Sequence, residues 1–212
     1  MSDIFREIDE ELRRENLLKL WQRYGKYAVM LAVAAVVATA LAVGWREYRL
    51  KERQAEGVRY AAALDLARQG KDQEAEAAFA AIAQGGGSRA LLARFEQASL
   101  EAKSGDRTKA AALYDAIAKD GGLEETYRDL ATLLAARLEV DQDPKQSIAR
   151  LEPLAQAGNP YRATALELTA IADLKEGDIK TARTTYQKLA DDPSVPAGAR
   201  ARAAEMLQAL AP

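Results

Sequence analysis

The sequence predicts an all-α protein in which one N-terminal transmembrane helix precedes an α-solenoid of about four helix hairpins and a C-terminal capping helix. Three observations predict this fold. The composition is rich in Ala, Leu, Glu, Arg and Lys and only 6% aromatic, which favours helices over strands. A long stretch without charge lies near the N-terminus. A helix-turn-helix pattern then recurs along the rest of the chain.

The recurring pattern is anchored on three turn glycines, Gly70, Gly105 and Gly177, and a degenerate fourth copy is centred on Gln142. The anchors are 35, 37 and 35 residues apart (105 − 70, 142 − 105, 177 − 142). Small residues stand seven positions before and five after each anchor, a ring or Leu at nine and a branched aliphatic at twelve. Seven positions before the anchors stand Ala63, Ala98, Ala135 and Ala170, and five after them stand Ala75, Ala110, Ser147 and Ala182. Nine positions after them stand Phe79, Tyr114, Leu151 and Tyr186, and twelve after them stand Ile82, Ile117, Leu154 and Leu189.

A period of about 34 residues with this chemistry is typical of tetratricopeptide repeats, in which each helix pair stacks on its neighbours. The small residues let two helices approach closely, the Gly ends the first helix, and the ring fills the gap beneath the next repeat. An unrelated Ala-rich bundle with chance matches is the alternative. Agreement at five or six offsets in three copies disfavours it.

Residues 27–45, YAVMLAVAAVVATALAVGW, carry no charge and are bracketed by Lys26 and Arg46. As a helix they span about 28 Å at 1.5 Å per residue, close to the hydrocarbon thickness of a bilayer. Aromatic rings, which favour the headgroup region, stand at both ends: Tyr24, Tyr27, Trp45 and Tyr48. The sequence therefore predicts a membrane anchor.

Two other readings of this segment are weaker. The Ala-rich end at 38–40 resembles a signal-peptide cleavage site, but both the apolar part and the leader of 26 residues are longer than such a peptide needs. A buried helix of a soluble core is disfavoured because apolar residues occupy every face.

The orientation of the anchor is left open by the charges. Six basic residues precede it and five follow within twenty positions, so the positive-inside bias favours a cytoplasmic N-terminus only slightly. They are Arg6, Arg13, Arg14, Lys19, Arg23 and Lys26 before the span, and Arg46, Arg49, Lys51, Arg53 and Arg59 after it.

We therefore divide the chain into a head (1–26), a transmembrane helix (27–45) and a repeat domain (46–212). In the head, Ile4, Phe5, Ile8 and Leu12 recur at helical spacing, which indicates either an amphipathic helix or a partly ordered tail. The membrane helix is expected to run on into the first repeat. Gly- and Pro-containing breaks at 85–87, 120–122, 157–160 and 191–196 separate the repeats, and 197–209 is the expected cap.

Catalytic chemistry has little support in this sequence. There is no His and no Cys, which excludes imidazole bases, thiolates and the commonest metal ligands, and Glu124–Glu125 more simply open a helix. GGGSR at 85–89 lacks the Gly-Lys-Ser/Thr ending of a phosphate loop. A net charge of −2 gives no footprint for nucleic acid. We expect no enzyme activity, cofactor, metal, nucleic acid or small-molecule substrate.

Binding of other proteins is the remaining class of function. The inner surface of a solenoid comes mainly from the first helix of each pair and holds protein segments. Ten positions before the anchors stand Tyr60, Phe95, Thr132 and Glu167, and two before them stand Arg68, Lys103, Val140 and Lys175. By analogy with repeat geometry, Tyr60, Arg68, Phe95, Lys103, Glu167 and Lys175 are candidate partner-binding residues. Tyr60 and Phe95 are also candidates for the core.

The layout of charged head, single span and repeats resembles the ancillary SecYEG translocon subunit family of single-pass bacterial inner-membrane proteins. The likeness covers nearly the whole chain and is most specific at Gly25–Lys26, at Gly44–Trp45–Arg46, and at Gly177–Asp178 with Ala182 and Tyr186. It implies a cytoplasmic N-terminus, a periplasmic repeat domain, and association with translocon subunits, periplasmic chaperones or newly translocated proteins. The head is longer than an anchor needs, and the third repeat is degenerate.

The function predicted on this basis is a membrane-tethered, chaperone-like adaptor at the Sec translocon exit. The alternative is a scaffold for an envelope assembly such as a division or cell-wall complex.

Overall fold

The computed structural model describes the backbone of residues 2–211 and the side chains of residues 21–27, 29–31 and 33–211. Within residues 2–211 the regular structure consists of α-helices and one short 3-10 helix, which confirms the predicted all-α class. The chain divides into two units at the boundary between Ala55 and Glu56.

Helix α1 (Ser2–Arg68) contains the head, the apolar segment and the first helix of the first repeat. The prediction that the apolar helix continues into the repeats is therefore confirmed. The backbone of the head is helical from Ser2, whereas the side chains of Ile4, Phe5, Ile8 and Leu12 lie outside the described ones.

The apolar part of α1 presents its large side chains outward on all sides. Val29, Leu31, Val36 and Leu41 are each more than half exposed. The hydroxyl of Thr39 is satisfied by donating to the carbonyl oxygen of Ala35, one turn earlier, at 2.8 Å. Among the residues whose placement is described, this helix is long and apolar enough to cross a membrane.

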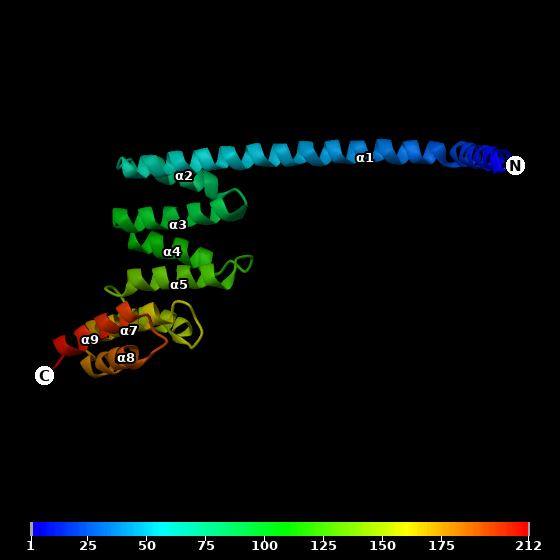
Figure 1. The fold of residues 1–212 in the computed structure, drawn as a ribbon. Helices are drawn as coiled ribbons and strands as arrows, with labels where there is room; N and C mark the ends of the chain where they lie inside the picture. Colours follow the sequence, from blue (N-terminus) through cyan, green and yellow to red (C-terminus); the bar gives the residue numbers. More distant parts are fainter. Residues whose placement is uncertain (1, 212) are drawn as a thin grey trace. The chain divides into compact units, whose positions relative to one another are not determined.

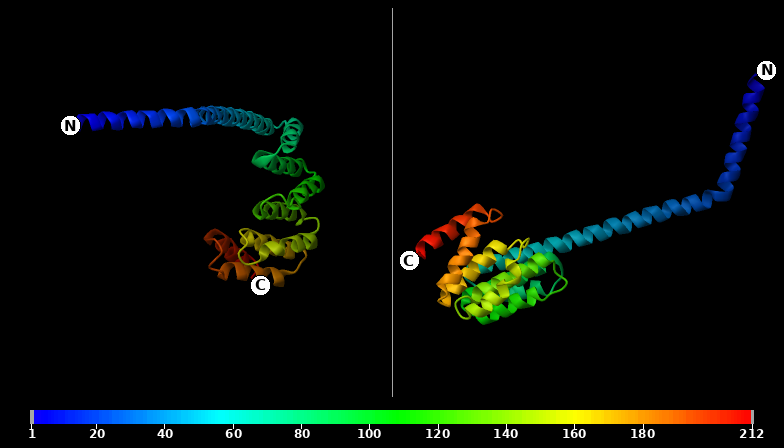
Figure 2. Two further views of the ribbon diagram at one scale, coloured as in Figure 1. Left: turned by 90° about the vertical axis from the view of Figure 1, so that its right-hand side faces the viewer. Right: turned by 90° about the horizontal axis from the view of Figure 1, so that it is seen from below.

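The repeat domain is a stack of paired helices (Figure 1). The first repeat pairs the end of α1 with α2 (Asp72–Ala83), the second α3 (Gly87–Ser104) with α4 (Arg107–Ala118), the third α5 (Glu125–Glu139) with α6 (Pro144–Leu151), and the fourth α7 (Arg162–Lys175) with α8 (Ile179–Asp191). Neighbours in sequence pack together from α2 to α9. Helix α9 (Ala197–Ala209) covers α8, which confirms the predicted cap (Figure 2).

The turns inside the repeats have the geometry that their residues predict. Gly70, Gly105 and Gly177 have φ of 75°, 98° and 82°, a region that residues with a Cβ atom rarely adopt. An Asp follows the turn position in three copies, and its side chain accepts a hydrogen bond from the backbone N–H three residues on, which caps the second helix. These residues are Asp106, Asp143 and Asp178.

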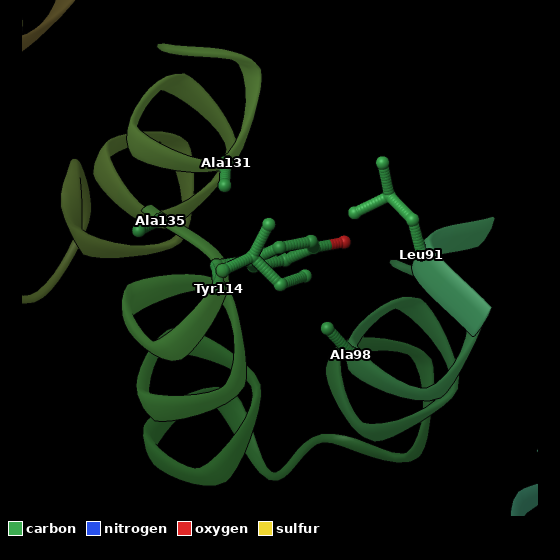
Figure 3. Close-up of a cluster of buried hydrophobic side chains, with 6 residues drawn as sticks. Leu91, Ala98, Tyr114, Ala131 and Ala135 are labelled. Atoms are coloured by element: carbon green, nitrogen blue, oxygen red, sulfur yellow. The ribbon is translucent and has the colours of Figure 1, made fainter. Parts of the chain in front are cut away.

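The core confirms the role of the recurring small residues. All eight positions before and after the anchors, including Ser147, are fully buried. The Tyr114 ring of α4 points into the gap between α3 and α5, against Leu91 and Ala98 on one side and Ala131 and Ala135 on the other (Figure 3). A larger side chain at these Ala positions would separate the helices that hold the ring.

The third repeat has the same packing of paired helices, but some of its residues differ from those of the other repeats. Its buried Ser147 hydroxyl donates to the carbonyl oxygen of Ala136 at 2.9 Å, so the polar group is satisfied. Helix α6 ends at Leu151, before Pro153, because a proline in the helix interior removes a donor and clashes with the preceding turn. The chain continues as a 3-10 helix, η1 (Pro153–Ala155), which buries Leu154.

Candidate partner-binding surface

The two aromatic candidates are half-buried members of the core packing. Tyr60 lies edge-on to Phe79, with ring centroids 5.6 Å apart, and its hydroxyl donates to Glu96 Oε1 at 3.4 Å. Burial is the main cause of the raised pKa of Tyr60, and the Glu96 carboxylate adds to it. Phe95 lies 6.1 Å from Tyr114. Both rings therefore contribute to the core and leave only part of their surface to a partner.

The four charged candidates form ion pairs. Arg68 pairs within α1 with Asp65, at 3.1 Å. The other three connect different elements. Lys103 Nζ lies 3.3 Å from Asp72, and Lys175 Nζ lies 2.9 Å from Asp141. Glu167 accepts hydrogen bonds from Nε and Nη2 of Arg202, both at 2.8 Å. Each of these contacts is made to a residue outside the candidate set. The six residues do not form one cluster.

Ion pairs of this kind recur along the stack. Asp141, in the turn of the third repeat, accepts from Lys175 of the fourth and from Arg107 of the second, and both cations lower its pKa. Lys109 of α4 contacts Glu101 of α3 and Glu76 of α2, and hydrogen bonds to these carboxylates raise its pKa. Charged side chains thus connect neighbouring repeats across the surface.

A pocket of about 350 Å³ lies in the first repeat, beside the start of the second. Its lining comes from α1, α2 and the start of α3. Leu66, Ile82 and several alanines make it mainly apolar, and Glu56, Arg59 and Arg89 are the charged residues at its edge. Volumes of this order, roughly 300–1,000 Å³, are those of pockets that take small groups.

The sequence prediction missed this pocket. Only one signal pointed to it: the loop after the first repeat reads GGG at 85–87, where the second repeat has DGG at 120–122. The sequence alone does not show that Gly85 in place of Asp matters, because the partner of Asp120, which is Arg94, is known only from the structure.

We also searched the described residues for a metal site and for buried carboxylates. Among them, no three His, Cys, Asp or Glu side chains are grouped so that they hold a metal ion. The most deeply placed carboxylates, Glu101 and Asp173, lie on the helices α3 and α7 of the stack.

The fold and this surface define a class: an α-solenoid of stacked helix hairpins, whose members bind other proteins and serve as scaffolds. The family model of the tetratricopeptide repeat-like domain matches residues 19–208, and the chain belongs to this family. Comparison with curated proteins and with solved structures gives no significant match.

Proposed function

We propose that the chain is a single-pass protein of the bacterial inner membrane whose repeat domain holds other proteins at the exit of the Sec translocon. In this proposal residues 1–26 are cytoplasmic, residues 27–45 cross the membrane and residues 46–212 lie in the periplasm. The partners are translocon subunits, periplasmic chaperones or newly translocated chains. The observation that carries the proposal is an outward-facing apolar helix on a chain whose remainder is a protein-binding repeat stack.

The side chains at the two ends of the apolar segment support a membrane position. Lys26 Nζ lies 5.1 Å from the centre of the Tyr27 ring, and the Arg49 guanidinium lies 5.4 Å from that of Trp45. Amphipathic rings and long cations favour the headgroup region, where the apolar part faces lipid and the charge meets water and phosphate. Such pairs at both ends match a helix that spans one bilayer.

Tethering explains how a modest surface can serve this role. The candidate residues are dispersed and partly engaged in ion pairs, so each offers only a weak contact. Attachment to the membrane raises the effective concentration of the repeat domain beside a membrane-bound translocon, and weak contacts then suffice. The likeness of the whole layout to translocon-associated proteins favours this partner over other membrane complexes.

The orientation can be tested directly because the chain has no Cys. A single cysteine is placed at the exposed turn residue Gln142, and intact cells are treated with a maleimide that does not cross the inner membrane. Labelling of intact cells is expected for a periplasmic repeat domain. Labelling only after lysis contradicts the proposed orientation.

The partner is tested by photo-crosslinking in living cells at Arg68 and Lys103, which are exposed and do not disturb the core. Adducts with translocon subunits, periplasmic chaperones or secreted chains are expected, and cytosolic adducts contradict the proposal. As a control, the span is exchanged for an unrelated anchor in a chain that also carries changes at these positions. If that variant still co-purifies with the translocon to the same extent, the proposed translocon role is also contradicted.

The cellular location distinguishes the proposed role from the alternative one. Enrichment of the protein at midcell, instead of dispersed membrane labelling, supports a scaffold for an envelope assembly.

A further inference from the structure

The second repeat joins its two helices by an internal ion pair. Arg94, eleven positions before the Gly105 anchor, donates to Asp120 Oδ2 at 2.7 Å and to the carbonyl oxygen of Ala116 at 3.2 Å. Asp120 directly follows α4 and its Lys119 cap, and the Arg94 hydrogen bond is the main cause of its lowered pKa. The fourth repeat has an Asp at the same offset: Asp192 accepts from Arg162 of α7 at 2.5 Å.

The first repeat has the same Arg but not the carboxylate. Arg59 stands eleven positions before Gly70, and Gly85 occupies the position of Asp120. The turn is alike in both repeats, because the Gly85 N–H donates to Ile82 O at 3.0 Å and the Asp120 N–H to Ile117 O at 3.1 Å. The third repeat lacks both partners, with Ala131 and Ala157 at these offsets. The cation without its carboxylate is therefore peculiar to the first repeat.

The pocket of about 350 Å³ lies where this carboxylate is missing, since Arg59, Gly85 and Gly86 all line it. The other Arg at its edge, Arg89, is matched by Glu56, with Nη1 and Oε2 3.4 Å apart. Among the described side chains no carboxylate is paired with Arg59, which is exposed. The apolar lining residues, Leu66, Ile82 and several alanines, carry no charge that could pair with Arg59.

We propose that this pocket is a docking site for a segment of a partner protein that carries an Asp or Glu next to an aliphatic residue. The partner's carboxylate accepts from the Arg59 guanidinium, as Asp120 accepts from Arg94 within the chain, and its aliphatic side chain fills the apolar part of the pocket. A guanidinium and a carboxylate form a strong, directional pair, and burial of the neighbouring apolar group adds to it. The inference rests on the proposed function only in requiring a protein partner.

The test uses the full chain in lipid nanodiscs and two short rhodamine-labelled peptides that differ in one group. One peptide carries a Leu-Asp pair and the other the matching Leu-Asn pair, and binding is followed by fluorescence anisotropy. We expect the Leu-Asp peptide to bind about three- to fivefold more tightly, because Arg59 is exposed and an exposed ion pair contributes less than a buried one. Equal binding of the two peptides, or no binding of either, overturns the proposal.

Two substitutions locate the site. Arg59→Gln is expected to reduce the preference for Leu-Asp to about twofold or less, whereas the matched control Arg94→Gln leaves it unchanged, because Arg94 already holds Asp120. Gly85→Asp supplies the missing carboxylate from within and is expected to block both peptides. The same turn carries Asp120 in the second repeat, and a Cβ atom at position 85 would lie 3.1 Å from Ile82 O, so the Asp requires only a small shift of this carbonyl. A preference that survives Arg59→Gln, or that is lost in Arg94→Gln, contradicts the assignment.

This inference and the proposed function fail in different ways. If the peptides are discriminated through Arg59 but the crosslinks show no translocon or periplasmic protein, the pocket stands and the translocon role falls. If the crosslinks show those partners and are unchanged by Gly85→Asp while the peptides bind equally, the role stands and the pocket falls.

Discussion

Arg150 of the third repeat reaches back to Asp115 of the second, with Nη2 and Oδ2 3.0 Å apart across 35 positions of sequence. The same guanidinium donates from Nε to Glu139 Oε2 at 2.7 Å, so one side chain connects α4, α5 and α6. The three side chains are 22%, 22% and 14% exposed. In the first and second repeats the position of Arg150 is held by Ala78 and Leu113. The degenerate repeat thus adds an ionic contact to its apolar packing.

Arg150→Met is expected to lower the free energy of unfolding by about 1–3 kcal/mol, because it leaves two largely buried carboxylates without their cation. For a chain of this size that corresponds to a fall of roughly 2–4 °C in Tm per kcal/mol. The measurement is thermal unfolding followed by circular dichroism.

Arg107→Met is the matched control for this change. Its pair with Asp141 is wider, at 3.4 Å, and both side chains are more than 40% exposed, so no measurable loss is expected. An equal loss of Tm in the two variants would show that the triad is no more than a surface pair.

Asp173 on α7 is a carboxylate that the fold disfavours in its charged form. Its side chain is buried, and no hydrogen-bond donor among the described residues reaches Oδ2. Burial, and secondly the charge of Asp178, raise its pKa above the ordinary value of 3.8. As the pH rises through 3.8, the unfolded chain loses this proton first, so stability falls until the folded-state pKa is passed.

Asp173→Asn is therefore expected to stabilise the repeat domain at neutral pH by about 1 kcal/mol, because the amide carries no charge to desolvate. The gain disappears below pH 3.8, where the carboxyl is protonated in both states. Unfolding curves at the two pH values measure the difference, with the exposed Asp191→Asn as control. A loss of stability at neutral pH would mean that the Asp173 carboxylate has a favourable partner.

The internal packing of the repeats was the part that the sequence predicted best. Ala98 and Ala135 are fully buried and Gly105 is left-handed, as their spacing around the anchor requires, because each must satisfy a steric condition that recurs in every repeat. The end of α6 before Pro153 follows from a rule of the same local kind, although the repeat pattern concealed it.

The surface was predicted less well, and the reason is physical. An offset in a repeat tells which face a residue occupies, but Lys103 and Glu167 pair with Asp72 and Arg202, which come from other repeats and from the cap. Such pairs depend on how successive repeats are rotated. The pocket depends on a difference between repeats, because Gly85 stands where the second repeat has an Asp. Repeats are aligned by the residues that they share, so this alignment does not select such a position.

The small-residue positions give a prediction about packing. Ala98→Leu is expected to cost about 1–3 kcal/mol, because the added atoms meet the Tyr114 ring in a filled space (Figure 3). The exposed Ala112→Leu on α4 serves as control and should leave Tm nearly unchanged. If both variants unfold at the same temperature as the unchanged chain, the second repeat must hold free volume beside Tyr114, which its fully buried alanines do not indicate.

The last prediction concerns the apolar segment of α1, where Val36 lies at the centre of residues 27–45. Val36→Lys is expected to weaken membrane insertion, since a Lys at the centre of a spanning helix adds about 2.5–3.5 kcal/mol to the apparent free energy of insertion. Val58→Lys is the matched control, because Val58 is 71% exposed in the repeat-domain unit and needs no lipid. After alkaline extraction of membranes, more of the Val36 variant than of the Val58 variant should be soluble. Equal retention of both would mean that the charge at residue 36 does not enter the hydrocarbon layer, and the membrane assignment of α1 would be wrong.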